Sequence, residues 1–567
     1  MRSTLRDRGL LRSGYRLAFA ALLGALIPGT ASAQRYLGDP VDVSQEFERL
    51  DATYFVASHV TKFDPATGQG ELQWDRYRRV PAYSFAKVDA NLVRAQGNEF
   101  PGTEYQSDPV LPFSISFVSP RTVRIRLSSR EWPLSDTASL MLVGGHAPVD
   151  HSWKMTRTDS TITWTSTGGS VRLTRNPWHV EFYDASGRLL TRTRNIGEPN
   201  TYAPPTPVSF VRRTRDLGRN TAVAFQLAHD EKIFGGGESF TRLNKRGQKM
   251  VLYTRDAMGV QTRREYKPIP FFLSSRGYGM FVHTSAPVTF DFGHDFDESG
   301  VLYSGDEVMD LFVFLGDPKQ VLEEYTALTG RSPVPPLWSF GFWMSRITYK
   351  SAAEVREVAQ KLRQYEIPAD VIHIDTGWFE TDWESDFTFS KERFPDPAKL
   401  MSDMAKEGFH ISLWQLPYFT PKNKLYPEIV ENGYSVKNPG GELPAEDAIL
   451  DMSNPAAVKW YQDELAGLLK TGASVIKVDF GEGAPLNGLY ASGRTGWYEH
   501  NLYPLRYNKA VFEVTQRVKG ADQGIIWARS AWAGSQRYPL HWGGDAENTN
   551  SAMAAELRGG LSFGLSG

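Results

Sequence analysis

The stretch that decides the fold is Ala473-Ser-Val-Ile-Lys-Val-Asp479-Phe-Gly-Glu482, an apolar run that ends on an acidic residue followed by a glycine. The β-branched residues Val475, Ile476 and Val478 are typical of a parallel strand that is covered on both faces. Asp479 then lies at the C-terminal end of this strand. In a barrel or a doubly wound sheet, binding and catalytic groups collect at that end, because the loops there form the mouth of the site.

Strands and helices alternate around this stretch throughout the C-terminal half. Strands are expected over residues 337–344, 369–375, 410–416, 475–478 and 524–529, and helices over residues 352–365, 397–407, 454–470, 504–519 and 551–558. Such alternation specifies a parallel sheet, and right-handed crossovers wind it into a (β/α)₈ TIM barrel. A doubly wound open sheet is the alternative architecture.

The N-terminal half has a different period. From about residue 35 to residue 331, short alternating strands such as 122–127, 161–165, 170–174 and 288–292 are separated by Gly, Pro, Asn and Asp turns. This pattern predicts an antiparallel β-sandwich. Prolines in Pro333-Val-Pro-Pro336 stop regular structure, so we expect a β-sandwich domain over 34–336 and the barrel over 337–567.

Two features of this half invite a functional interpretation. Gly235-Gly-Gly-Glu-Ser239 is glycine-rich, but its spacing fits neither the dinucleotide nor the Walker pattern, and a tight turn is the simpler prediction. The indoles of Trp132, Trp153, Trp164 and Trp178 could stack on sugar rings, but core packing of a large sandwich explains them more simply.

Composition limits the remaining classes. Residues 1–33 combine five arginines, an apolar run over 17–27 and Ala31-Ser-Ala33, which predicts a cleaved signal peptide and a secreted or periplasmic protein. The 11-residue run is shorter than the roughly 20 residues that span a bilayer. A net charge of −2 without a basic block argues against a nucleic-acid partner, and the absence of cysteine excludes disulfides and thiolate metal sites.

Chemically useful residues follow the predicted strands of the barrel. They are Asp375, Trp414, Asp479, Arg529 and Asp545. In a barrel all five face one mouth. Two carboxylates among apolar and cationic walls are what glycoside hydrolysis needs, because one acid attacks or stabilises the oxocarbenium-like centre while the other protonates the leaving oxygen.

Several segments together resemble glycoside hydrolase family 31, which contains α-glucosidases and α-xylosidases. They are Tyr266-Lys-Pro-Ile-Pro-Phe271, Val371-Ile-His-Ile-Asp375, Arg393-Phe-Pro-Asp-Pro397, Ile476-Lys-Val-Asp-Phe-Gly-Glu482, Ala528-Arg-Ser530 and His541-Trp-Gly-Gly-Asp545. The resemblance implies a TIM barrel that follows an N-terminal β domain in the sequence. It also implies glycoside or oligosaccharide substrates, and no cofactor or metal is expected.

By this resemblance, Asp479 matches the catalytic nucleophile, Asp545 the general acid/base, and Asp375 an acid that binds sugar hydroxyls in the −1 subsite. Four further positions match residues that line that subsite: Trp414, Lys477, Arg529 and Trp542. Lys477 and Asp479 point the same way from their strand, so the ammonium should favour the ionised form of Asp479. Asp545 must be protonated when substrate binds, which calls for a raised pKa.

The chain departs from the family pattern at two places. Thr376 and Gly377 stand where the compared α-xylosidases have bulkier residues, which would leave room for a hydroxymethyl group and favours glucose over xylose. The final segment Leu561-Ser-Phe-Gly-Leu-Ser-Gly567 resembles the seventh strand, so the barrel is expected to be incomplete at its C-terminus.

The leading hypothesis is a secreted retaining exo-α-glycosidase that releases terminal α-glucosyl or α-xylosyl units through a covalent glycosyl-enzyme intermediate. Transglycosylation is a near alternative, because a sugar hydroxyl can replace water at the intermediate. More distant alternatives are a non-catalytic carbohydrate-binding protein and a metal-dependent barrel hydrolase, which would need clustered ligands at strand ends.

Overall fold

The computed structural model of the protein describes residues 41–81, 90–95, 108–196, 206–443 and 447–566. The predicted signal peptide, residues 1–33, lies outside the described residues. Within the part of the chain that the structure describes, no helix is both long and apolar enough to cross a bilayer.

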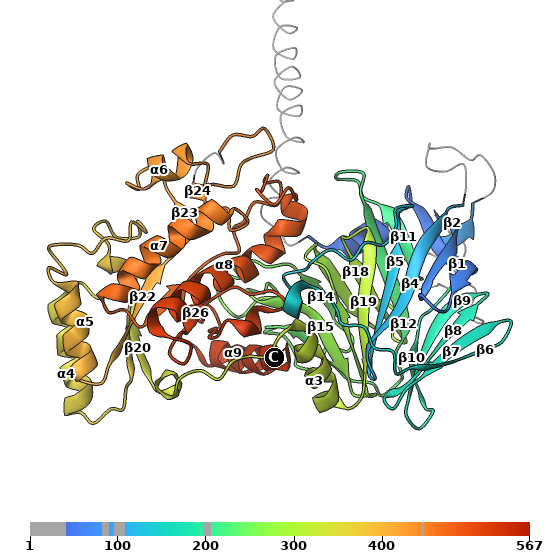
Figure 1. Cartoon of the computed structure of the whole chain (residues 1–567), viewed down its shortest axis with the longest axis horizontal. Helices are drawn as coiled ribbons and strands as arrows, with labels where there is room; N and C mark the ends of the chain where they lie inside the picture. The colour runs from blue at the N-terminus through green and yellow to red at the C-terminus, as the bar shows by residue number, and fades with distance from the viewer. Residues whose placement is uncertain (1–40, 82–89, 96–107, 197–205, 444–446, 567) are drawn as a thin grey trace, which may run out of the picture. The chain divides into compact units, whose positions relative to one another are not determined.

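The N-terminal half is built on a large antiparallel sheet of 14 strands (Figure 1). Across the sheet the strands follow the order β13 (Ile233–Gly237), β15 (Pro268–Ser274), β16 (Tyr278–Val282), β19 (Val308–Leu315), β5 (Thr122–Ser128), β4 (Val110–Ser119), β2 (Gln69–Pro81), β1 (Thr53–Asp64), β11 (Ser209–Arg212), β12 (Arg219–Gln226), β18 (Ser299–Ser304), β17 (Val288–Phe292) and β14 (Lys249–Leu252), and β3 (Ala90–Arg94) pairs with β2.

A second antiparallel sheet of five strands covers part of this sheet. Its order is β10 (Leu189–Arg192), β9 (Trp178–Asp184), β8 (Gly169–Arg175), β7 (Thr161–Thr165) and β6 (Lys154–Arg157). Alternate residues of β7, β8 and β9 are buried, as expected for strands with one face on a core. The predicted antiparallel β-sandwich is therefore confirmed.

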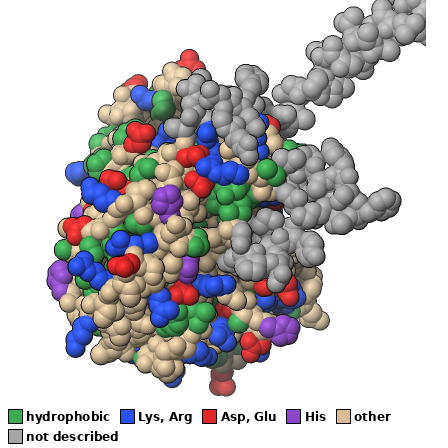
Figure 2. Space-filling view, turned by 90° about the vertical axis from the view of Figure 1, so that its right-hand side faces the viewer, with side chains coloured by type: hydrophobic (Ala, Val, Ile, Leu, Met, Phe, Trp, Pro, Cys, Tyr) green, Lys and Arg blue, Asp and Glu red, His purple; other side chains and the backbone are tan. Residues whose placement is uncertain are grey.

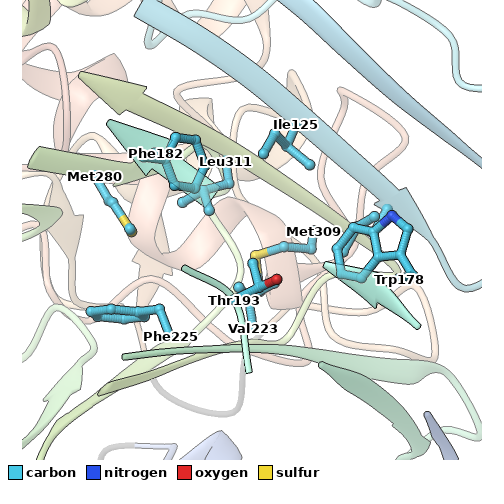
Figure 3. Close-up of a pocket in the computed structure, with 10 residues that line it drawn as sticks. Ile125, Trp178, Phe182, Thr193, Val223, Phe225, Met280, Met309 and Leu311 are labelled. Carbon is cyan, nitrogen blue, oxygen red and sulfur yellow. The ribbon is translucent and has the colours of Figure 1, made fainter. Parts of the chain in front are cut away.

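Apolar side chains from both sheets fill the sandwich core. Figure 3 shows Trp178 and Phe182 of the small sheet facing Ile125, Leu311 and their neighbours of the large sheet. The space left between them is about 10 Å³, which is about the smallest volume that admits one water molecule. Figure 2 shows acidic and basic side chains interspersed over one outer face, in agreement with the near-neutral net charge.

The four tryptophans of the sandwich divide into two kinds. Trp153, Trp164 and Trp178 are buried, which confirms core packing for these three indoles. Trp132 is 70 % exposed, so core packing does not explain it.

The predicted tight turn at Gly235–Ser239 is wrong. Gly235, Gly236 and Gly237 belong to β13, and all three have φ between 87° and 113°. The glycines let the strand bulge against β15, where a Cβ at Gly237 would lie 2.2 Å from the Lys267 carbonyl oxygen. The bulge ends at the buried residue Glu238.

The C-terminal half carries a parallel sheet whose spatial order follows the chain: β20 (Trp343–Arg346), β21 (Val371–Ile374), β22 (His410–Gln415), β25 (Val475–Val478) and β26 (Ile526–Ala528). Four helices connect these strands: α4 (Ala352–Gln364), α5 (Pro397–Lys406), α7 (Pro455–Thr471) and α8 (Gly496–Lys519). An order that never reverses is that of a barrel, whereas a doubly wound sheet contains a switch point. The predicted TIM-barrel architecture is confirmed.

Residues 539–542 extend this sheet beyond β26. Ile526 N donates to the Pro539 carbonyl, Leu540 N to Ile526, Ala528 N to Leu540, and Trp542 N to Ala528. This alternation is a parallel ladder, so the segment takes the sixth strand position and delivers residues 543–545 to the barrel mouth.

Shorter elements complete the described chain. They are η1 (Val43–Phe47), η3 (Val143–Gly145), α3 (Pro318–Thr329), η4 (Leu337–Phe340), η5 (Thr376–Trp378), β23 (Tyr418–Phe419), α6 (Tyr426–Glu431), β24 (Ala448–Ile449), η6 (Ser535–Arg537), α9 (Asn550–Phe563) and η7 (Gly564–Ser566). Helix α3 begins with a capping box on Asp317 and lies in the N-terminal half.

The strand predicted over 337–344 is wrong in its first half. Residues Leu337–Phe340 form a 3₁₀ turn, and β20 begins only at Trp343. Leu337 and Phe340 are 88 % and 70 % exposed, so the apolar run that suggested a buried strand is not buried.

The seventh strand predicted over Leu561–Gly567 is also wrong in the described residues. Helix α9 extends through Phe563 and continues as a 3₁₀ turn to Ser566. Its buried face consists of small residues spaced three or four apart: Ala552, Ala555, Gly559 and Ser562. That face packs near β13, where Ser562 Oγ donates to the Gly235 carbonyl, while Leu561 remains 54 % exposed.

The domain boundary at 336/337 stays a prediction. One continuous core of buried apolar residues runs from the sandwich into the barrel half, from Phe55 to Tyr538. Indole hydrogen bonds from Trp497 to the Gly305 carbonyl and from Trp532 to the Thr284 carbonyl also join the two halves.

Candidate active site

Asp479 leaves β25 and is held from three directions. Its Oδ2 accepts a hydrogen bond from Trp414 Nε1 at 2.6 Å, and Lys477 Nζ lies 3.5 Å from the same oxygen. Its Oδ1 lies 3.3 Å from Arg529 Nε and accepts from the Phe480 amide at 2.8 Å. Two cations and two N–H donors therefore stabilise a negative charge on a carboxylate that is 6 % exposed.

The backbone directly after Asp479 is unusual. Phe480 has φ = 61°, in the left-handed region that residues with a side chain rarely adopt. Its ring lies 4.1 Å from Cζ of Arg529, and the next turn is held by Tyr418, whose hydroxyl accepts from the amides of Gly481 and Gly483. This geometry turns the chain sharply away and leaves the Asp479 carboxylate among its partners.

Asp375 ends β21 beside Asp479. Its Oδ2 is 3.2 Å from Lys477 Nζ and 2.8 Å from His373 Nε2. Burial opposes the charge of Asp375, but the hydrogen bond and charge of His373 and the charge of Lys477 outweigh it and lower its pKa to about 2. Lys477 thus joins two carboxylates that follow different strands.

Arg529, which follows β26, is the centre of the site. Its guanidinium is 2 % exposed and forms a bidentate pair with Glu482, with both distances 2.9 Å. It also contacts Asp545 Oδ2 at 3.0 Å, Asp256 Oδ2 at 3.3 Å and Asp479 Oδ1 at 3.3 Å. Burial disfavours this cation, but the surrounding carboxylates outweigh that effect and raise the pKa of Arg529.

Asp545 is the more accessible of the two candidate catalytic carboxylates. Its side chain is 56 % exposed, whereas that of Asp479 is 8 % exposed. Partial desolvation and the charges of Asp479 and Asp256 raise the pKa of Asp545, against the opposing effect of Arg529. One guanidinium therefore contacts a buried carboxylate and an open one whose protonated form is favoured.

Two indoles cover the other side of Lys477. Its Nζ lies 4.8 Å from the ring centre of Trp542 and 5.3 Å from that of Trp527. The Trp542 carbonyl accepts a hydrogen bond from Lys267 Nζ at 2.5 Å. Cation–π contacts of this kind favour a desolvated ammonium.

The seven residues selected from the sequence therefore come together. Asp375, Lys477, Asp479, Arg529 and Asp545 form one connected set of ion pairs, and Trp414 and Trp542 contact it directly. The structure brings together the residues, and their catalytic and binding roles stay predictions.

Comparison with known families identifies the family of the chain. Residues 332–567 match the model of the glycosyl hydrolases family 31 TIM-barrel domain, and residues 112–291 match that of the glycosyl hydrolase 31 N-terminal galactose mutarotase-like domain. The chain belongs to glycosyl hydrolase family 31. The predicted family is thus confirmed.

Individual relatives in family 31 share part of their length with this chain. An α-xylosidase, XylQ, of Lactiplantibacillus pentosus is 36 % identical over 417 residues, which are 70 % of this chain and 52 % of that protein. An α-xylosidase of Emericella nidulans is 35 % identical over 61 % of this chain and 46 % of its own length. Alpha-glucosidase 2 of Bacillus thermoamyloliquefaciens is 28 % identical over 72 % and 53 %. The chain spans about half the length of these curated relatives.

Solved structures of family 31 enzymes have the same fold. A dextranase of Flavobacterium johnsoniae in complex with glucose aligns over 90 % of this chain and 60 % of that chain, with a TM-score of 0.74 and 23 % identity. An α-xylosidase from a soil metagenome in complex with xylose aligns over 80 % and 68 %, with a TM-score of 0.70 and 22 % identity.

Three residues of the site were not predicted from the sequence. Glu482 lies three residues after Asp479 in the same sequence motif, and its carboxylate forms a bidentate pair with Arg529. A second acid so close to the strand end was the signal that could have identified it. Asp256 and Tyr266 come from the β-sandwich half, where no site residue was predicted. No periodicity or spacing connects Asp256 to an arginine 273 positions later.

The prediction of open space for a hydroxymethyl group beside Gly377 is wrong. A Cβ built on Gly377 would lie 2.5 Å from Thr348 Oγ1, so the space beside Gly377 is already filled by Thr348. Thr376 is 1 % exposed and therefore does not line an open pocket. The departure at Thr376 and Gly377 does not discriminate between glucose and xylose.

Histidines do not assemble a metal site at the barrel mouth in the described residues. His373 is buried between Ser412 and Asp375, and burial lowers its pKa. Among the described residues, metal-ligand spacing occurs only at Asp291, His294 and Asp295 on the sandwich, where Lys249 Nζ already lies 3.3 Å from Asp295.

Proposed function

We propose that the protein is a retaining exo-α-glycosidase that releases terminal α-xylosyl or α-glucosyl units from oligosaccharides or glycosides. The observation that supports this most directly is the contact of one buried guanidinium, Arg529, with both Asp479 and Asp545. Retaining enzymes need two carboxyl groups about 5–5.5 Å apart, and two carboxylates on one guanidinium are compatible with such a separation.

The two carboxylates suit different tasks. Asp479 is surrounded by Lys477, Arg529 and the Trp414 N–H, so its charged form is available to attack the anomeric carbon. Asp545 has a raised pKa and an exposed side chain, so it can protonate the departing glycosidic oxygen. The bond from Asp479 to the sugar replaces the glycosidic bond, and Asp545 then removes a proton from the water that hydrolyses the intermediate.

Asp375 and Lys477 provide binding rather than bond-making groups. The pKa of Asp375 is about 2, so its carboxylate accepts hydrogen bonds from sugar hydroxyls throughout the working pH range. Lys477 donates to Asp375 and lowers the repulsion between Asp375 and Asp479 as their shared counter-ion. Trp542 adds an apolar wall of the kind that sugar-ring faces pack against, whereas Trp414 is fully buried and acts on Asp479 through its N–H.

Relatives give more support to xylosyl than to glucosyl units. Two α-xylosidases are 36 % and 35 % identical to this chain, against 28 % for the α-glucosidase. With the pocket argument for glucose removed, xylose becomes the first sugar to test.

Transfer to a sugar acceptor is a second candidate function. An isomaltosyltransferase of Sporosarcina globispora is 25 % identical over 85 % of this chain and 46 % of its own length. Transfer uses the same glycosyl-enzyme intermediate, with an acceptor hydroxyl in place of water. Product analysis with and without added xylose or glucose separates the two reactions.

The test uses the full-length protein with the nitrophenyl α-glycosides of xylose, glucose and galactose. Proton NMR should detect the α-anomer of the released sugar first, and initial release of the β-anomer would refute retention. Asp479→Ala should abolish turnover, while Asp522→Ala, at an exposed turn, serves as the matched control.

We also propose that the protein is exported. Support comes from the arginines, apolar run and Ala31-Ser-Ala33 of residues 1–33. N-terminal sequencing of the protein from an extracellular or periplasmic fraction should give a chain that starts at Gln34, and recovery of an intact Met1 end from the cytoplasm would contradict export.

A further inference from the structure

A large cleft lies between the sandwich and the barrel, away from the residues of the candidate active site. Its volume is about 1140 Å³. One wall consists of β5, the loop 130–145 and the ends of β16 and β19, and the other of residues 493–509 at the start of α8 together with Arg537 and Tyr538. Concave sites where two parts of a chain meet are common ligand sites.

Cations outnumber anions on the walls of the cleft. The basic residues are Arg124, Arg126, Arg130, Arg494, Arg506, Lys509 and Arg537, and the acidic ones are Asp306, Glu307 and Asp310. Most of these acids are already engaged: Asp310 pairs with Arg124 at 2.7 Å, and Glu307 pairs with Arg130 at 2.5 Å.

Three guanidinium groups of the cleft form no direct ion pair with a carboxylate among the described residues. Arg126 is 8 % exposed, and it donates only to Ser114 Oγ at 3.1 Å and to the Ser135 carbonyl at 3.2 Å. Arg494 approaches Ser285 Oγ at 3.5 Å, and Arg537 donates to the carbonyls of Gly534 and Leu140. Arg126 is the buried one of the three, and a buried cation that lacks a direct ion pair is costly, so its place on the cleft wall favours a ligand that carries negative charge.

An exposed indole stands on the same cleft. Trp132 is 70 % exposed, with Cζ of Arg130 5.8 Å from its ring centre. Two contacts hold its loop in place: Arg126 donates to the Ser135 carbonyl, and Arg124 pairs with Asp136 at 2.9 Å. An aromatic face on a fixed loop is suited to stack on the apolar face of a pyranose ring.

We propose that this cleft is a second saccharide-binding site, which holds an oligosaccharide bearing a uronic-acid carboxylate. The carboxylate pairs with the guanidinium groups of Arg126 and Arg494, and a neighbouring pyranose stacks on Trp132. The hydroxyl-bearing walls, with Ser128, Thr137, Ser139 and Thr495, offer partners for sugar hydroxyls.

This site goes beyond the proposed function, because binding here and turnover at the barrel mouth are measured separately. The probe is trigalacturonic acid, titrated into the full-length protein by calorimetry, with maltotriose as the neutral saccharide and ATP as the nucleotide. We expect saturable binding of trigalacturonic acid, and binding of maltotriose at least about tenfold weaker, since one charge-assisted contact is worth about that factor. ATP has no pyranose ring to stack on Trp132 and should also bind more weakly.

Two variants test the assigned contacts. Trp132→Ala and Arg494→Gln should each raise the Kd for trigalacturonic acid at least about tenfold, which corresponds to about 1.4 kcal/mol. Tyr365→Ala and Arg172→Gln, at exposed positions elsewhere, are the matched controls and should leave the Kd unchanged. All four variants should hydrolyse a nitrophenyl glycoside at the wild-type rate.

The proposal is overturned if trigalacturonic acid shows no saturable binding, if its Kd is the same in wild type, Trp132→Ala and Arg494→Gln, or if ATP binds more tightly. Competitive inhibition of glycoside turnover by trigalacturonic acid with unchanged Kd in both variants would place its binding at the barrel mouth and would also refute a separate site.

Discussion

Lys267 connects a buried ion pair to the segment that carries Asp545, and this makes its replacement informative. Lys267 Nζ lies 2.5 Å from Glu238 Oε2, with side chains that are 1 % and 2 % exposed, and it also donates to the Trp542 carbonyl. The glycines that follow Trp542 fit tightly: a Cβ at Gly544 would meet the Tyr266 ring at 2.3 Å. The segment is therefore held in place from the sandwich side.

Removing one partner of a buried ion pair costs about 3–5 kcal/mol, because the other charge is left without compensation. In Lys267→Met the loss should lie near the lower end, since burial already raises the pKa of Glu238 to about 8 and a proton can neutralise it. The double variant Glu238→Leu/Lys267→Met replaces both charges by apolar groups and should recover most of the unfolding free energy.

Activity should respond differently from stability. Lys267→Met and the double variant both leave the Trp542 carbonyl without its donor, so kcat/KM should fall at least about tenfold, as small misplacements of catalytic groups do. Glu238→Gln keeps that donor and should lose stability while it retains activity. Urea unfolding midpoints and nitrophenyl glycoside kinetics on the full-length protein give the two readouts. Full activity of the double variant would show that Lys267 does not position the Asp545 segment.

Three further expectations follow from groups that are buried or have a raised pKa. Asp545→Asn should remove the alkaline limb of the pH profile of kcat/KM, because the raised pKa keeps the wild-type acid protonated to higher pH. It should also lower the turnover of substrates with poor leaving groups about 10²–10⁴-fold. An unchanged alkaline limb would show that another group causes it. The pKa of Glu238 is raised by burial, so the folded state binds more protons and Glu238 should lower the unfolding free energy as pH rises from about 4.5 to 8, by up to about 1.4 kcal/mol per pH unit. Urea titrations of Glu238→Gln should show a shallower slope than wild type, and the remainder is expected because burial also raises the pKa of Glu265 to about 8. Trp178→Ala should cost about 3–5 kcal/mol because it empties a fully buried site, whereas Trp132→Ala on the exposed loop should change the unfolding midpoint little; equal effects would contradict the burial of Trp178.

Local patterns predicted the parts of the fold that depend on neighbours in sequence. Val475–Val478 is the strand expected from its β-branched run, and Asp479 follows it at the mouth. Acids and bases at strand ends meet because parallel strands share one C-terminal edge, so Asp375 and Arg529 could be chosen before any contact was known.

Contacts between distant segments could not be predicted in this way. The helix over Asn550–Phe563 was mistaken near its end for a strand, because Leu561 and Phe563 outweighed the small residues that pack near β13. Asp256 reaches Arg529 from a loop of the other half, and only the packing of sandwich against barrel brings the two together. The space beside Gly377 depends on Thr348, which lies 29 positions away.

The loop that follows β14 limits how the two halves can be exchanged with those of a relative. Asp256 contacts the central guanidinium, Tyr266 lies against Gly544, and Lys267 holds the Trp542 carbonyl, all from outside the barrel. If the barrel of a relative were fused to this sandwich, its site would be completed by three side chains that did not evolve with it. Crossover points for functional chimeras should therefore fall before Thr254 or after the barrel, so that the loop and the site it completes are inherited together.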